Sequence, residues 1–146
     1  MSNLLKIDGE VQHPQAISFD QLAAIDDRYQ ETDMTRYGMK FPSDAVKLRG
    51  ILEMVGINSA AKFLNVHSSP DDFHACVPLE PIRETALLIY RLNGEPLEPK
   101  AGGPVRFFIP EHVPCKTGEL DACANVKFVD WIEFLPEKVV DSRSNS

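Results

Sequence analysis

The chain has 146 residues, of which 43% are hydrophobic and 25% charged, a balance that fits one globular domain with a packed core. Its formal net charge of −7 disfavours nucleic acid and anionic lipid as partners, because no cluster of lysine and arginine reverses the negative field. No apolar run is long enough to span a bilayer, and the first residues lack the pattern of a signal peptide. We therefore expect a cytoplasmic protein whose three cysteines stay reduced.

The predicted elements are mostly short strands bounded by turn residues. In chain order they are a strand over 4–9, a helix from 18 to about 25, a loop with one strand over 26–45, a helix over 48–55, and strands over 62–67, 73–77, 87–92, 105–109 and 126–134. Ser18 and Gln21 match a capping box at the start of the first helix, and Gly56 suits the end of the second. Asn93-Gly94 favours a tight turn between strands.

This order of elements predicts an α+β fold dominated by β structure. The strands over 87–92, 105–109 and 126–134 are expected to belong to one β system. No repeat or low-complexity linker divides the chain. A single domain is therefore predicted over residues 1–138, followed by a disordered tail over 139–146.

Several short motifs follow one another in the second half of the chain. They are Asn93-Gly94-Glu95-Pro96-Leu97, Gly102-Gly103-Pro104-Val105-Arg106, Asn125-Val126-Lys127-Phe128 and Ile132-Glu133. In this order and spacing they resemble the second half of the molybdopterin-binding domain of the sulfite oxidase family. Weaker similarities extend the resemblance over most of residues 4–135. It implies a sulfite oxidase-like fold, with a mixed-sheet or barrel-like β system and a few short helices.

The residue types in these motifs suit an anionic small-molecule ligand that bears a phosphate. Arg106 offers a planar fork for phosphate oxygens, and Lys127 adds a second positive charge. Gly103 lacks a Cβ, which lets the backbone approach a bulky ligand. In the family, the residues that match Arg106 and the Asn125-Val126-Lys127 stretch contact the molybdopterin cofactor, and the resemblance implies the same roles here. The alternative for Arg106 is an ordinary ion pair on a strand.

His67 and Ser68 follow a predicted strand in a region that passes close to the cofactor in the family. The resemblance implies that they line the pocket. The alternative is that His67 is a hydrogen-bonded structural residue, which is common for a histidine at the end of a strand.

The sequence departs from the family where the metal is bound. Catalytic members hold molybdenum with a cysteine thiolate that precedes the segment matching 48–52, yet residues 1–75 contain no cysteine. The matching region, 31–38, offers only harder or neutral groups such as Asp33. Ala101 also replaces the asparagine usual before the Gly-x-Pro-x-Arg strand. We therefore predict that sulfite or sulfoxide redox turnover is impaired or absent.

A loop with His112, Cys115 and Cys123 is a second candidate site. Zinc accepts one histidine and two cysteines, with a fourth ligand from elsewhere or from water. The spacing matches no strong zinc motif, and the alternative is a rigid loop with two buried thiols.

Three functions follow from these residues. The first is a molybdopterin-binding, oxidoreductase-like domain that retains its pocket with impaired or absent catalysis. The second is a cofactor-free binding or scaffold module on the same fold. The third is a small metal-binding protein that uses the His112, Cys115 and Cys123 loop.

Overall fold

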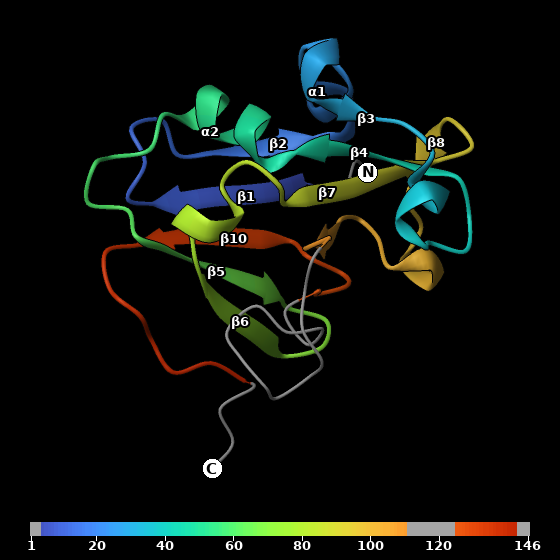
Figure 1. Ribbon diagram of the computed structural model, residues 1–146. Helices are drawn as coiled ribbons and strands as arrows, with labels where there is room; N and C mark the ends of the chain where they lie inside the picture. The colour runs from blue at the N-terminus through green and yellow to red at the C-terminus, as the bar shows by residue number, and fades with distance from the viewer. Residues whose placement is uncertain (1–3, 111–124, 143–146) are drawn as a thin grey trace.

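Two β-sheets form most of the molecule. The computed structural model describes residues 4–110 and 125–142. The first sheet has the strand order β2-β1-β10-β5-β6, and the second has the order β3-β4-β7-β8, with β9 pairing to β7. In Figure 1 the first sheet runs from β2 near the top to β6 near the bottom. The strands are β1 (Leu4–Gly9), β2 (Gln15–Ser18), β3 (Gln30–Glu31), β4 (Ser43–Lys47), β5 (Phe63–Ser68), β6 (Phe73–Pro78), β7 (Leu87–Leu92), β8 (Glu95–Pro96), β9 (Arg106–Phe108) and β10 (Trp131–Leu135).

The main hydrophobic core joins the inward side chains of both sheets. Ile7 of β1 pairs with Ile132 of β10, β1 and β10 being parallel, and both side chains are fully buried. Leu88 and Phe107 of the second sheet belong to the same core. Ile89 belongs to a second, smaller cluster. On β7 and β9 the members of this cluster alternate with the members of the main core. The α+β fold predicted from the sequence is confirmed.

Both α-helices begin where their local sequence predicts, and α2 also ends there, whereas α1 ends at Ala23 and not at about residue 25. In α1 (Phe19–Ala23) the Ser18 Oγ accepts from the Gln21 amide at 3.2 Å, and the Gln21 Oε1 accepts from the Ser18 amide at 2.9 Å. α2 (Leu48–Val55) ends at Gly56, whose φ of 64° suits a residue without a Cβ. Within the described ranges, no helix has the length and apolar character that crossing a membrane requires.

The segment 26–45 contains more structure than predicted. It holds two 3-10 helices, η1 (Asp27–Tyr29) and η2 (Met34–Tyr37), and two strands, β3 and most of β4, where one strand was expected. β3 and β4 pair through only two residues each, which is too short for an alternating pattern to show in the sequence. The other 3-10 helices are η3 (Glu80–Ile82) and η4 (Pro99–Ala101).

The predicted strand over 126–134 is wrong in its first half and in its sheet. Only Trp131–Leu135 is a strand, β10, and it belongs to the first sheet, whereas β7 and β9 lie in the second. Phe128 has a φ of 58°, a left-handed conformation that interrupts an extended strand. The three segments therefore do not form one sheet, although β7 and β9 pair as expected.

The chain beyond β10 returns to the edge strand β6. The Asp141 Oδ2 accepts from the Cys76 amide at 2.6 Å. The Ser142 Oγ accepts from the His74 amide at 2.9 Å, and the Ser142 amide donates to the His74 carbonyl at 2.9 Å. These contacts place residues 141–142 against the sheet, beyond the predicted domain end at 138. Residues 143–146 of the predicted tail lie outside the described residues.

Candidate functional site

Two segments that are distant in sequence lie side by side at the end of the second sheet. The Phe107 amide donates to the Val126 carbonyl, and the Val129 amide to the Val105 carbonyl, each at 2.8 Å. The Ile109 amide donates to the Asn125 Oδ1 at 2.8 Å. Asn125 therefore holds the backbone beside β9, and this pairing brings the segment with Lys127 against the strand with Arg106.

Arg106 and Lys127 line the same cavity, which has a volume of about 510 Å³. Two further basic residues, Lys40 and Lys100, also line it. The other lining residues are largely apolar: Met39, Phe41, Ser43, Ile89, Leu92, Leu97, Ala101, Gly102 and Phe128. We call this space the basic cavity, because four of its described lining residues are cationic and none of them is acidic.

The four cations of the basic cavity have no carboxylate partner among the described residues. Within residues 4–110 and 125–142, no carboxylate forms an ion pair with Lys40, Lys100, Arg106 or Lys127. Arg106 is half-buried, and this burial lowers the pKa of its guanidinium. The group remains charged at neutral pH, because arginine starts from so high a value. In a chain of net charge −7, four positive groups thus surround one cavity without an ion pair to any carboxylate of the described ranges.

Gly102 and Gly103 are required by close packing on either side of the chain. A Cβ on Gly102 would lie 2.6 Å from the Arg106 Cδ, and Gly102 has a φ of 102°. A Cβ on Gly103 would lie 1.8 Å from the Leu97 carbonyl oxygen. Gly103 does not line the basic cavity but a neighbouring one.

This neighbouring space, which we call the acidic cavity, has a volume of about 400 Å³. Its lining residues are Pro70, Asp71, Pro99, Gly103, Pro104, Phe128 and Asp130. The Asp130 Oδ1 accepts from the Ser69 amide at 3.1 Å. The two cavities therefore carry opposite charge and share Phe128.

His67 and Ser68 do not line either cavity. The His67 ring stacks on Trp131 with a centroid distance of 3.9 Å, and its Nε2 lies 3.2 Å from the Glu133 Oε1. His74 lies on the neighbouring strand β6, and its ring stacks on the His67 ring with a centroid distance of 5.3 Å. Ser68 is buried, and its hydroxyl has no hydrogen-bond partner among the described atoms. The structure thus gives His67 the hydrogen-bonded structural setting that was the alternative to a pocket role.

The candidate metal ligands find no counterpart in the described residues. His112, Cys115 and Cys123 lie outside them. Among residues 4–110 and 125–142, no three His, Cys, Asp or Glu side chains gather as metal ligands would. Asp33 caps η2 by accepting from the Thr35 amide at 3.2 Å and from the Thr35 hydroxyl, and these bonds lower its pKa.

Lys40 and Lys100 were not predicted from the sequence. Lys40 lies in the irregular chain between η2 and β4, and Lys100 lies in η4, three residues before Gly103. Neither belongs to a motif. A single lysine in a loop gives no signal of its own, so only the packing of β4, β7 and β9 reveals that both face one cavity.

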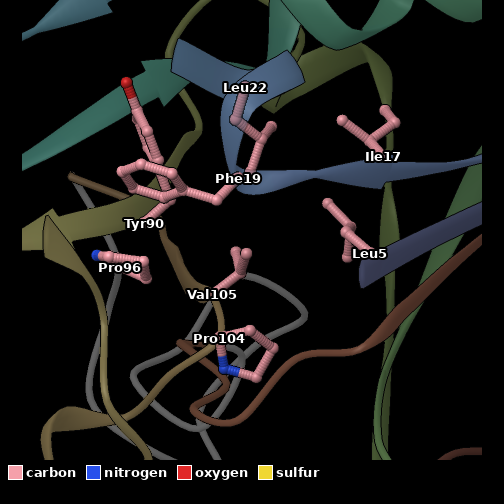
Figure 2. A pocket seen from close by; sticks show the side chains of 8 residues that line it. All are labelled: Leu5, Ile17, Phe19, Leu22, Tyr90, Pro96, Pro104 and Val105. Carbon is pink, nitrogen blue, oxygen red and sulfur yellow. The ribbon is translucent and has the colours of Figure 1, made fainter. Parts of the chain in front are cut away.

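A third, much smaller space lies at the edge of the core. Figure 2 shows eight apolar or aromatic side chains around a cavity of about 10 Å³, among them Leu22, Pro104 and Val105. The Tyr90 hydroxyl points away from it and donates to the Gln30 Oε1 at 2.7 Å. The space is at most that of one water molecule and its walls are apolar, so it is a packing gap and not a ligand site.

The chain is similar to known proteins in sequence and in fold. A relative from Bacillus subtilis (strain 168), the uncharacterized oxidoreductase YuiH, is 31% identical over 114 residues, which are 73% of this chain and 56% of that protein. The crystal structure of the sulfane dehydrogenase SoxCD from Paracoccus pantotrophus aligns with a TM-score of 0.66 and 18% identity, over 97% of this chain and 39% of that one. At this identity the likeness concerns the fold alone.

The chain therefore spans little more than half the length of the curated relative that it matches. The sequence model of the oxidoreductase molybdopterin-binding domain matches residues 42–141, which include β9, β10 and every residue named above as lining the basic cavity except Met39, Lys40 and Phe41. This match covers more than half of the chain. The chain thus belongs to the oxidoreductase molybdopterin-binding domain family.

Proposed function

We propose that the chain binds a phosphate-bearing ligand of the molybdopterin type in the basic cavity. We also propose that it does not use this ligand to catalyse a redox reaction. The observation that supports binding is the set of four cations, Lys40, Lys100, Arg106 and Lys127, around one cavity in which the described residues provide no carboxylate. A cavity of about 510 Å³ has the size of small-molecule sites in proteins.

The cavity fits the phosphate part of such a ligand well. Arg106 presents a planar set of donors that suits two phosphate oxygens, and a charge-assisted bond of this kind contributes about 1.5–3 kcal/mol. The apolar lining, which includes Phe41 and Phe128, suits the flat body of a pterin. These residues would hold and orient the ligand.

The fit to a metal is poorer. When bound, molybdopterin supplies the metal site and its redox chemistry, and the protein normally adds a thiolate. Of the lining residues that the structure describes, none is Cys, His, Asp or Glu. The described cysteine, Cys76, is fully buried in β6 of the first sheet. The described residues of this cavity therefore offer no thiolate ligand for a redox-active metal.

The test is purification from a host that makes molybdopterin. Wild type, Arg106→Ala and Arg83→Ala would be assayed for oxidised pterin by fluorescence and for molybdenum by elemental analysis. Arg83 is a matched control, because it is also half-buried but pairs with Glu80 at 3.8 Å and does not line the basic cavity.

We expect pterin with wild type and with Arg83→Ala, and about tenfold to hundredfold weaker binding in Arg106→Ala, from the loss of the charge-assisted bonds. Equal pterin in all three proteins, or none in wild type, would contradict the binding site. Stoichiometric molybdenum together with turnover of sulfite or a sulfoxide would contradict the absence of catalysis.

A further inference from the structure

The basic and acidic cavities are separated by a thin wall. Gly102 lines the basic cavity, and the next residue, Gly103, lines the acidic one, so the backbone between them divides the two spaces. Phe128 lines both cavities. Its amide donates to the Gly102 carbonyl at 2.8 Å, which joins the aromatic residue to the glycine backbone. The wall therefore consists of Gly102, Gly103 and Phe128.

Phe128 holds an unusual backbone conformation at this place. Its φ of 58° is a genuine outlier for a bulky residue. The residues on each side are fixed to the neighbouring segment, because the Val126 carbonyl accepts from Phe107 and the Val129 amide donates to Val105, each at 2.8 Å. Such a conformation persists only when its surroundings impose it, and it is concentrated at ligand sites.

The wall also separates opposite charges. Lys100, Arg106 and Lys127 are among the cations on one side, and Asp71 and Asp130 are on the other. An anionic ligand end is attracted to the first space and repelled from the second. A ligand end that offers N–H donors is attracted to the carboxylates of the second space.

We propose that Phe128 is a specificity-determining residue that confines a phosphate-bearing ligand to the basic cavity. This inference rests on the proposed function, since it concerns the ligand of the same cavity. With the wall intact, the heterocycle of a long ligand does not reach Asp71. With the ring of Phe128 removed, the part of the wall that this side chain forms opens beside the Gly102–Gly103 backbone, and a ligand with a phosphate at one end and an amino heterocycle at the other reaches both cavities.

Two probes separate these cases. Inorganic pyrophosphate is compact and engages only cations. Guanosine 5′-monophosphate carries a phosphate and a 2-amino-pyrimidinone edge, the same donor edge that a pterin presents. Affinities of both probes would be measured by calorimetry on wild type, Asp71→Asn, Phe128→Ala and the Phe128→Ala/Asp71→Asn double variant.

For wild type we expect both probes to bind, and Asp71→Asn to change the affinity for the nucleotide less than twofold. In Phe128→Ala the ratio of nucleotide affinity to pyrophosphate affinity should rise about tenfold, as one added charge-assisted hydrogen bond gives. The double variant should return this ratio to the wild-type value, because the gained contact is to Asp71.

The outcomes distinguish this inference from the proposed function. Failure of pyrophosphate to bind wild type would overturn the proposed function. Binding of pyrophosphate with an unchanged ratio in Phe128→Ala would overturn only the role of Phe128. If Phe128→Ala does not fold, Phe128→Gly removes the same ring and relieves the positive φ. In wild type itself, a tenfold loss of nucleotide affinity in Asp71→Asn would show that the ligand already crosses the wall, and would also overturn the inference.

Discussion

The side chain of Arg106 lies directly over Gly102, so closely that a Cβ on Gly102 would be 2.6 Å from the Arg106 Cδ and 2.7 Å from its Cγ. The glycine is therefore part of the anion site, although it offers no side chain. It fixes where the guanidinium can lie, and the same backbone forms the wall toward the acidic cavity.

The change Gly102→Ala should weaken pyrophosphate binding several-fold, because Arg106 must move aside. It should also cost about 1–2 kcal/mol of unfolding free energy, from the positive φ of 102°. Gly38→Ala is the matched control, since Gly38 has a φ of 88° and an added Cβ there would have nothing within 4 Å. Urea unfolding should show similar losses for both variants, and calorimetry should show weaker binding for Gly102→Ala alone. Equal binding in the two variants would contradict the role of Gly102.

Neutralising the two unpredicted lysines should weaken anion binding. Lys40→Gln and Lys100→Gln are each expected to lower pyrophosphate affinity about two- to fivefold, as exposed charge interactions usually contribute. The loss should shrink as salt is added, because the groups are exposed. Lys62→Gln serves as control, since Lys62 is exposed and lies outside the basic cavity. An effect of the same size in Lys62→Gln would mean that only net charge matters.

Enlarging the internal gap should destabilise the fold without altering the site. Leu22 is 3% exposed and lines the cavity of about 10 Å³ shown in Figure 2. Leu22→Ala is expected to lower the unfolding free energy by about 2–5 kcal/mol, as large-to-small changes in a core do. Val140→Ala, at a residue that is 78% exposed, should change it by less than about 0.5 kcal/mol. Urea unfolding would measure both changes, and a loss below about 1 kcal/mol for Leu22→Ala would contradict this account of the core.

Asp33 should make stability depend on acid pH. Hydrogen bonds from the Thr35 hydroxyl and amide lower the pKa of Asp33 below its ordinary value of 3.8. Its stabilising contribution is therefore present above that value and is lost as the pH falls through the lower pKa of the folded state. The melting temperatures of wild type and Asp33→Asn should differ most near neutral pH and converge in strong acid. A difference that stays constant over the whole range would contradict the prediction.

Local signals in the sequence predicted the local structure well. The capping box of Ser18 and Gln21 and the cap at Gly56 depend on neighbouring residues, and both appear as expected. The Asn93-Gly94 turn connects β7 to β8, with positive φ at both residues. The motifs predicted the family and hence the fold.

Features that depend on distant contacts were not predictable in this way. The segment before β10 has the composition of a strand, yet its backbone pairs with residues 102–107 and turns at Phe128. The opposite charges of the two cavities depend on Lys40 and Asp71, which come from loops in different parts of the chain. The sequence predicted Arg106 and Lys127 as ligand contacts. Only the structure shows which other residues line the cavity around them.

Residues 141–142 cover part of the outer edge of β6. An edge strand with unpaired amides is a template for aggregation, because a strand of another molecule can add to it. Here the amides of His74 and Cys76 donate to side-chain oxygens of Ser142 and Asp141. A carboxylate and a hydroxyl satisfy these donors without presenting a new ladder of backbone groups beyond them. The outward amides of His74 and Cys76 are thus satisfied within the molecule and do not offer themselves to a strand of another molecule.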